Sequence, residues 1–163
     1  MNTKEKEFTA LIEEHQAIIH KITRIYEIQS EERQDLFQEI VYQLWKSYPS
    51  FSGASKFTTW MYRVALNTAI TIYRSRRITY TSVNDFNFSL KTEDDSEETE
   101  EQLRELYKAI QQLNDIDKAI IFLYLENHSG KEIADAIGIS EVNVRVRMNR
   151  IKTRLKELMT SNK

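Results

Sequence analysis

The stretch SGKEIADAIGISEVNVRVRMNRIKTRLKEL, from Ser129 to Leu158, decides the fold of the C-terminal part of the chain. Its first residues contain the S-x-x-E pattern of a capping box, formed by Ser129 and Glu132. This box predicts a short helix over Lys131–Ile137. Gly138 follows and can adopt the positive φ that closes a helix. A tight turn at this glycine is therefore expected.

A second helix is predicted directly after the turn, with Ser140 as its cap. An apolar stripe with intervals of four and three residues supports it, at Val144, Met148, Ile151, Leu155 and Leu158. Three residues have the types that this motif needs. Ala134 is small enough for two helices to touch, Gly138 suits the turn, and Val144 is a branched apolar residue that anchors the second helix. This order of helix, tight turn and helix predicts a helix-turn-helix.

The other faces of this second helix are left to solvent if the stripe points inward. They carry Asn143, Arg145, Val146, Asn149, Arg150 and Lys152. Arginine can bond guanine, asparagine can bond adenine, and valine can contact a thymine methyl group. Six basic residues stand against two acidic ones from Ser140 to Leu158, which favours a DNA-reading helix over an ordinary solvated surface.

The net charge of the chain does not reveal the basic character of this helix. The 163 residues include 23 basic and 25 acidic side chains, a net charge of −2 that by itself argues against DNA binding. Residues 1–78 carry +2, residues 79–102 carry −7 and residues 103–163 carry +3. The middle stretch is polar and acidic, as in a solvated linker. We therefore expect two small domains, 1–78 and 103–163, joined by an acidic linker, 79–102.

Three helices are expected in the first domain. Apolar residues at three- and four-residue intervals predict one helix that ends near Tyr26 and another over Glu32–Ser47, which stops before Pro49. A third begins near Phe57 and ends in a basic cluster. With only three glycines and one proline, the chain has few residues for tight turns, so the predicted fold is all-α.

An aromatic segment, YPSFSGASKFTTWMYR, precedes the third helix. Its aromatic side chains lie near basic groups, an arrangement that suits stacking of unpaired bases. The spacing of Phe57 and Trp60 matches the apolar stripe, so we expect both to belong mainly to the core. The loop around Gly53 is the better candidate for a ligand contact, because glycine lets the backbone approach closely.

Several classes of protein are disfavoured by the sequence. Without cysteine there is no disulfide or thiolate site, and the three histidines lack the spacing of a helical metal pair. No nucleophile or acid–base pair assembles, so no enzyme, metal or cofactor is expected. No apolar run is long enough to span a membrane, and the N-terminus is charged, which predicts a soluble cytoplasmic protein.

Taken together, the order of motifs resembles the extracytoplasmic-function group of bacterial sigma factors in their minimal two-domain form. DLFQEIVYQLWKSYPSF (Asp35–Phe51) is similar to the helix of sigma domain 2 that docks on the β′ coiled coil of RNA polymerase. FSGASKFTTWMYRVALNTAITIYRSRR (Phe51–Arg77) is similar to the loop and helix that capture and melt the minus-10 element. The C-terminal unit resembles sigma domain 4, which reads the minus-35 element and also meets the polymerase β flap.

The resemblance implies three sets of site residues. Core polymerase would contact Asp35, Leu36, Gln38, Glu39, Tyr42, Gln43 and Trp45. The minus-10 element would contact Phe51, Ser52, Gly53, Ala54, Ser55, Trp60, Arg63, Asn67, Arg74, Arg76 and Arg77, with a flipped-out base held between the loop and Asn67. The minus-35 element would contact Asn143, Arg145, Val146, Arg147, Asn149, Arg150 and Lys152. An anti-sigma factor is a common further partner in the family.

The recognition helix departs from the family pattern. Relatives often have glycine, threonine and serine where this chain has Val142, Asn143 and Val146, so a promoter sequence cannot be transferred from them. Two other functions remain open at this point. A conventional helix-turn-helix regulator would bind its duplex site unaided, and a helical adaptor would bind only protein and tolerate alanine at Arg145 and Arg150.

Overall fold

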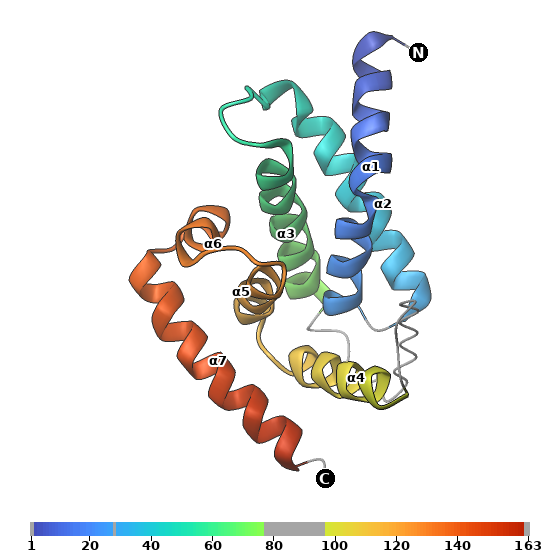
Figure 1. The fold of residues 1–163 in the computed structure, drawn as a ribbon. Coiled ribbons are helices and arrows are strands. Elements are labelled where there is room, and N and C mark those ends of the chain that lie inside the picture. Colours follow the sequence, from blue (N-terminus) through green and yellow to red (C-terminus); the bar gives the residue numbers. More distant parts are fainter. Residues whose placement is uncertain (1, 28, 77–96, 162–163) are drawn as a thin grey trace. The chain divides into compact units, whose positions relative to one another are not determined.

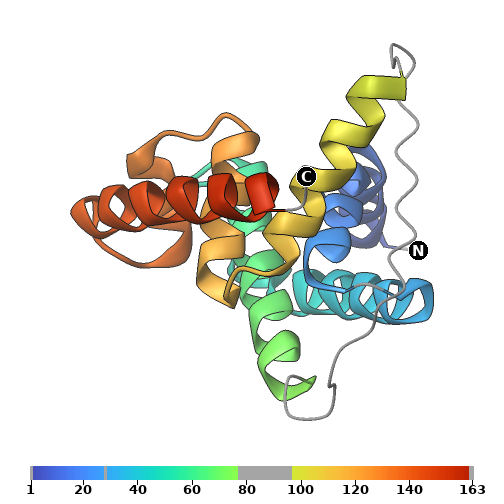
Figure 2. The ribbon, with the colours of Figure 1, turned by 90° about the horizontal axis from the view of Figure 1, so that it is seen from below.

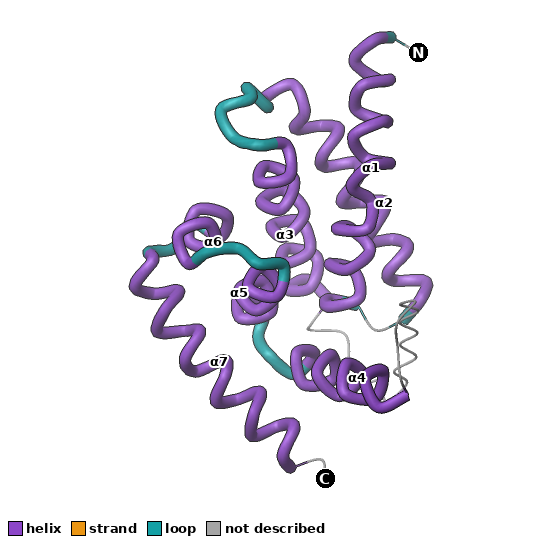
Figure 3. The backbone as a smooth tube through the Cα atoms, in the orientation of Figure 1, coloured by secondary structure: helices purple, strands orange, loops and turns teal. Residues whose placement is uncertain are grey.

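The computed structural model describes residues 2–27, 29–76 and 97–161, which belong to two compact units, Met1–Tyr80 and Thr81–Lys163. Over these residues the chain consists of helices joined by short loops, and it contains no strand (Figure 1, Figure 3). The all-α fold predicted from the scarcity of glycine and proline is confirmed.

Three long helices form the first unit: α1 (Thr3–Tyr26), α2 (Ser30–Ser47) and α3 (Phe57–Arg76). Each of them packs against the other two, as views from two directions show (Figure 1, Figure 2). The side chain of Asn2 caps α1 by accepting a hydrogen bond of 2.8 Å from the backbone N–H of Glu5. The three predicted helices are confirmed, with α2 beginning two residues earlier than expected.

The core of this unit is aliphatic and closed to solvent. Its fully buried side chains (0% exposed) come from all three helices and include Ile19, Ile22, Ile40, Leu44, Met61 and Ala65. Burying a large aliphatic side chain contributes about 1.5–3 kcal/mol, so the shared core, more than helix propensity, holds the three helices together.

The segment between α2 and α3 contains the aromatic residues of the sequence pattern. A short 3-10 helix, η1 (Tyr48–Ser50), follows α2 with Pro49 in its first turn. The N–H of Phe51 donates to the carbonyl of Tyr48 at 3.0 Å and closes this turn. The α-helix ends before Pro49 as predicted, but Tyr48, the residue before the proline, keeps right-handed α backbone at φ −56° and ψ −38°. The α-helical hydrogen bonds stop because Pro49 has no N–H to donate.

Four helices form the described part of the second unit: α4 (Glu97–Gln111), α5 (Asp115–Leu125), α6 (Gly130–Ile137) and α7 (Glu141–Ser161). Helix α7 packs against α4, α5 and α6. Its predicted apolar stripe is buried, with Val144, Met148, Ile151, Leu155 and Leu158 each at most 8% exposed. The opposite faces of α7 are therefore available to a partner.

The helix-turn-helix forms through the local signals found in the sequence. The Ser129 hydroxyl accepts from the N–H of Glu132 at 3.1 Å, and the Glu132 carboxylate accepts from the N–H of Ser129 at 3.1 Å, which completes the capping box. Gly138 ends α6 in the left-handed region at φ 84°. The Ser140 hydroxyl then caps α7 by accepting from the N–H of Asn143 at 3.0 Å.

The predicted linker differs from the structure at its C-terminal end. Residues 79–96 of this stretch lie outside the described residues, but residues 97–102 form the first turns of α4. This end of the predicted linker is therefore helical. No helix among the described residues is long and apolar enough to cross a membrane.

Candidate nucleic-acid interface

The predicted minus-35 residues all lie on α7, between Asn143 and Lys152. Exposed side chains belong to Arg145, Val146, Asn149, Arg150 and Lys152, whereas Asn143 and Arg147 are half-buried. Val142, one turn before Val146, is 62% exposed and shares its face. Val142 is not among the predicted contact residues, although the sequence already placed it on the reading face with Val146, four residues later.

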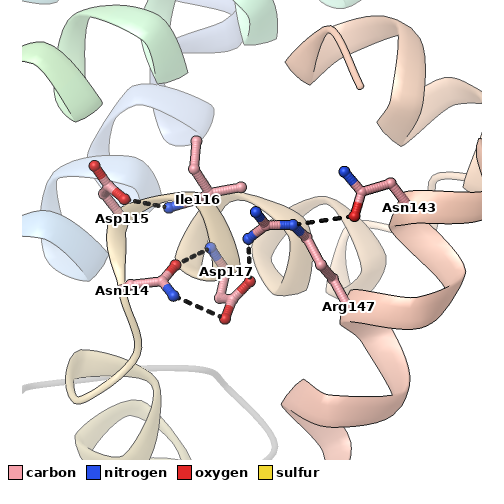
Figure 4. Close-up of polar contacts among 6 residues, drawn as sticks. All are labelled: Asn114, Asp115, Ile116, Asp117, Asn143 and Arg147. Carbon is pink, nitrogen blue, oxygen red and sulfur yellow. Dashed lines mark hydrogen bonds and ion pairs between the residues drawn. The ribbon is translucent and has the colours of Figure 1, made fainter. Parts of the chain in front are cut away.

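Arg147 is engaged inside the second unit. Its Nη1 lies 3.2 Å from Oδ1 of Asp117 on α5, and its Nε donates to Oδ1 of Asn143 at 3.3 Å (Figure 4). Asn114, which caps α5, donates to the other carboxylate oxygen of Asp117 at 3.1 Å. These contacts orient Arg147 toward α5, so it ties α7 to α5, whereas its neighbours Arg145 and Arg150 are exposed.

A cation–π contact holds another predicted residue. The ammonium of Lys152 lies 4.8 Å from the centre of the Tyr124 ring on α5. Tyr124 is 44% exposed, so the contact lies at the surface. Lys152 therefore lies at one edge of the exposed face, where an ammonium group can also meet a phosphate.

In the first unit, the predicted minus-10 residues begin at a cluster of aromatic rings. The Phe51 ring lies 5.3 Å from the ring of Trp60 and 5.9 Å from that of Phe57. Tyr48 joins them at 6.4 Å from Phe51 and 6.2 Å from Trp60. Phe51, Phe57 and Trp60 are all half-buried. The cluster is thus partly core, as expected for Phe57 and Trp60, and partly an exposed stacking surface beside the loop.

The loop that follows Phe51 is open. Ser52, Gly53, Ala54 and Ser55 are all exposed. The N–H of Ala54 donates to the Ser52 hydroxyl at 3.4 Å. Gly53 has φ 78°, and apart from its chain neighbours no described heavy atom lies within 4 Å of the position that a Cβ would take. The positive φ explains the glycine here. The free space around it leaves the backbone accessible to a ligand.

Asn67 lies on α3, away from this loop. It lines a cleft of about 420 Å³ between α2 and α3 with Glu39, Gln43, Ser47, Val64, Thr68, Thr71 and Ile72. None of the loop residues lines this cleft. Ten helical residues separate Phe57 from Asn67, about 15 Å along the axis. The structure therefore does not bring the loop and Asn67 into one pocket.

The arginines predicted for the minus-10 element lie along α3. Arg63 and Arg74 are exposed, and Arg76 is the last residue of the helix. Arg77 lies outside the described residues. Exposed arginine side chains of this kind can contact phosphates.

The predicted polymerase-contact residues share one exposed face of α2, with one exception. Asp35, Gln38, Tyr42 and Trp45 are exposed, and Glu39 and Gln43 at the edge are half-buried. Leu36 is only 1% exposed and points into the core with Ile40 and Leu44. A side chain without exposed surface cannot contact a partner, so Leu36 stabilises the unit and is removed from this set.

An apolar groove follows the same face of α2. It has a volume of about 380 Å³ and is lined by Phe8, Phe37, Gln38, Val41, Tyr42 and Trp45. Tyr42 is 55% exposed and Trp45 is 38% exposed. Large exposed aromatic side chains of this kind are typical anchors of a protein interface. The groove adds Phe8, Phe37 and Val41, which the sequence pattern did not distinguish from the core.

A basic pocket lies at the junction of α1 and α2. It is lined by His20, Thr23, Arg24, Ser30, Arg33, Gln34, Phe37 and Gln38. Burial, followed by the charge of Arg24, lowers the pKa of His20 below its usual 6.5 and the pKa of Arg33 below its usual range. The His20 ring stacks on Phe37 at 4.6 Å. Across the described residues, no group of acidic, histidine or cysteine side chains could hold a metal ion.

Comparison with known proteins adds the family. Residues 11–78 match the family model for sigma-70 region 2, and residues 103–155 match the model for sigma-70 region 4. The first match contains α2, the aromatic loop and α3. The second contains the helix-turn-helix, and the two matches together cover well over half of the chain.

Individual relatives agree with these models. The RNA polymerase sigma factor NccH of Alcaligenes xylosoxydans is 27% identical over 168 residues, covering 95% of this chain and 88% of that protein. The ECF sigma factor SigX of Bacillus subtilis is 28% identical over 126 residues, covering 72% of this chain. The match spans 65% of SigX, and a match of 43% identity to SigG of Mycobacterium tuberculosis spans only 12% of that protein.

Solved structures share the fold. The sigma factor RpoE of Bartonella quintana, solved in complex with the anti-sigma factor NepR, has a TM-score of 0.77 at 17% identity, covering 97% of this chain and 99% of that chain. CnrH, solved with the cytosolic domain of CnrY, has a TM-score of 0.71 at 20% identity, covering 98% and 91%. Given both family matches in this order, the chain belongs to the extracytoplasmic-function group of the sigma-70 family.

Proposed function

We propose that this chain is a sigma factor that binds core RNA polymerase, directs it to specific promoters and promotes promoter melting. The observation that carries the proposal is the presence, on one chain, of an exposed aromatic face on α2 and an exposed basic face on α7, each within its matching sigma-70 region. A protein with only one of these surfaces could bind polymerase or DNA but could not connect them.

Core polymerase would bind the α2 face. Tyr42 and Trp45 would anchor the contact in the apolar groove, and Asp35 and Gln38 would add polar contacts at its edge. Helix α7 would place the complex on the minus-35 element, where its basic side chains would hold phosphates and its outward face would contact bases. The chain would thus fix the register of polymerase on the promoter.

Promoter melting would use the first unit. Flipping a base out of the duplex costs a few kcal/mol, and stacking on an aromatic ring returns about 1–3 kcal/mol per base. Phe51 and Trp60 offer partly exposed rings beside an open loop, and Asn67 lies at a separate polar cleft. We propose two contact points for the unpaired strand, the aromatic loop and the Asn67 cleft. This mechanism needs no catalytic residue.

An anti-sigma factor is proposed as a further partner. A structural relative, RpoE of Bartonella quintana, was solved in complex with one. The aromatic face of α2 offers such an antagonist a surface where binding would exclude polymerase.

The deciding experiment adds the purified chain to sigma-free core polymerase from the source organism on a genomic template. Specific run-off transcripts that require the chain are expected, and their absence with a competent core would refute the proposal. Tyr42→Ala should reduce core binding, whereas Gln16→Ala, at an exposed position of α1, should not. Duplex binding by the chain alone, with no effect of core polymerase, would instead favour a conventional regulator.

A further inference from the structure

The exposed face of α7 has an uncharged centre. Successive residues of an α-helix are rotated by about 100°, so Val142, Val146, Asn149 and Thr153 fall within about 60° of one another. All four are exposed and lie opposite the buried stripe that contains Val144 and Ile151. We call this set the neutral ridge.

Basic side chains flank the neutral ridge on both sides. Arg145, Lys152 and Lys156 lie along one side, and Arg150 and Arg154 lie along the other, all of them exposed. Arg154 also pairs with the carboxylate of Glu157 at 3.9 Å, so its charge is partly balanced. A helix in the major groove has the bases in front of it and a phosphate chain on each side. The charges on α7 are arranged to fit the major groove, because the neutral ridge would face the bases and the basic side chains would face the phosphates.

Val142 and Val146 contribute little to the stability of the free protein. Val142 is 62% exposed and Val146 is 51% exposed, so neither contributes much to the core. Valine is also a weaker helix former than alanine, lysine or arginine. An apolar protein partner does not explain them well, because cationic rows border them on both sides. The apolar valines and the basic side chains beside them together indicate a partner that presents both methyl groups and negative charge.

Two other candidates for base reading are occupied elsewhere. Arg147 pairs with Asp117, and the side-chain oxygen of Asn143 accepts a hydrogen bond from Arg147. Their contacts turn these side chains toward α5 (Figure 4). In the first two turns of α7, the part of a recognition helix that contacts base edges, the valines are therefore the central outward-facing side chains.

We infer that Val142 and Val146 are specificity-determining residues that contact the C5 methyl groups of thymines in the minus-35 element. This inference rests on the proposed function and deepens it by naming the base feature that is recognised. Thymine is the standard base that presents an apolar group in the major groove. A promoter of this chain would then carry A·T pairs where the neutral ridge meets the groove.

The test removes single methyl groups from the DNA. Promoters are first identified from the transcripts that the full chain and core polymerase produce on genomic DNA. In synthetic copies, each minus-35 thymine on either strand is replaced in turn by deoxyuridine, which lacks only the methyl group. Holoenzyme binding should fall about fourfold at one or two positions, the loss expected for one buried methyl-sized group, and stay unchanged at the others.

Variants of the chain assign each methyl group to a side chain. Val142→Ala and Val146→Ala should each abolish the difference between thymine and deoxyuridine at one position. Both side chains are more than half exposed, so the variants keep the fold. Leu125→Ala, at a 43% exposed position of α5 outside the neutral ridge, is the matched control and should retain the full difference.

The outcomes separate this inference from the proposed function. Two results would overturn the inference and leave the sigma-factor function intact, provided that transcription is promoter-specific. In the first, deoxyuridine is tolerated throughout the minus-35 element. In the second, the binding losses caused by deoxyuridine simply add to those caused by the valine variants. An element without thymine on either strand would overturn it as well. A lack of specific transcripts would refute the proposed function and this inference with it.

Discussion

The guanidinium of Arg147 on α7 lies 3.2 Å from the carboxylate of Asp117, a residue 30 positions earlier on α5. The two side chains are only 29% and 20% exposed, so water screens the pair less than it would at the open surface. The contact joins the recognition helix to the helix on which the motif rests. It makes Arg147 a residue that positions α7.

Breaking this ion pair is expected to loosen α7. In a double-mutant cycle with Arg147→Ala and Asp117→Ala, we expect a coupling free energy of about 0.5–1 kcal/mol, because each single change already removes the interaction. The coupling free energy is measured from the hydrogen-exchange rates of the α7 amides in the full chain. A loss of promoter binding in Arg147→Ala with unchanged exchange would show that Arg147 contacts DNA directly.

Arg145 and Arg150 should behave differently. Both are exposed on either side of the neutral ridge, so alanine at either position should weaken promoter binding by the holoenzyme and leave hydrogen exchange in α7 unchanged. If both contact phosphates, each substitution should lower the slope of log affinity against log salt concentration by about one. Arg104→Ala, at an exposed position of α4, is the matched control and should alter neither quantity.

Substitutions of Gly138 in the turn measure the free-energy cost of backbone strain. Gly138→Ala should destabilise the second unit by about 1 kcal/mol, because an L-residue is strained at φ 84°. Beyond the local backbone, no described heavy atom lies within 4 Å of the added Cβ, so the cost comes from the backbone conformation. Gly138→Asn should cost less, since asparagine tolerates this region. Equal exchange rates in all three proteins would contradict this explanation.

His20 should make the stability of the first unit depend on pH. Burial and the charge of Arg24 lower its pKa in the folded state below the unfolded value of 6.5. The unfolded chain therefore binds more protons in mildly acidic solution, and the unfolding free energy should decrease as the pH falls from about 8 to about 6.

Tryptophan fluorescence measures this dependence, because the only two tryptophans, Trp45 and Trp60, both lie in the first unit. His20→Gln should reduce the pH dependence of the unfolding midpoint in urea. His15→Gln, on the same helix, is the control and should retain it. A midpoint that is constant over this pH range in the unsubstituted chain would contradict the lowered pKa.

Much of the fold could be predicted because its signals are local. The capping box at Ser129, the left-handed Gly138 and the stop at Pro49 each depend on interactions within a few residues, so the sequence pattern alone identifies them. The apolar stripes of α1, α2 and α7 likewise predict which faces are buried.

Helix α4 shows why the rest was missed. Its first turns contain mostly acidic residues and few apolar ones, so this stretch has the composition of a solvated linker. The apolar residues begin only at Leu103, where the second domain was expected to start. The general preference for acidic residues in the first turn of a helix was the signal that could have extended the prediction.

The site was predicted less completely because its geometry depends on distant residues. Leu36 was assigned to the polymerase surface from a continuous motif, but burial against the other helices excludes it. Asp117 determines the direction of Arg147 across 30 residues, which no spacing rule reveals. The separation of Asn67 from the aromatic loop could have been predicted, because ten helical positions after Phe57 place Asn67 about 15 Å along α3.

The backbone of the helix-turn-helix is fixed by Ser129, Glu132, Gly138 and Ser140, and none of these belongs to the neutral ridge. Architecture and recognition therefore depend on separate sets of residues. Exchanging one outward side chain of α7 should alter the preferred bases at a stability cost within about 0.5 kcal/mol. A duplicated copy of this gene could thus acquire new target genes through very few substitutions, each leaving a folded protein for selection to act on.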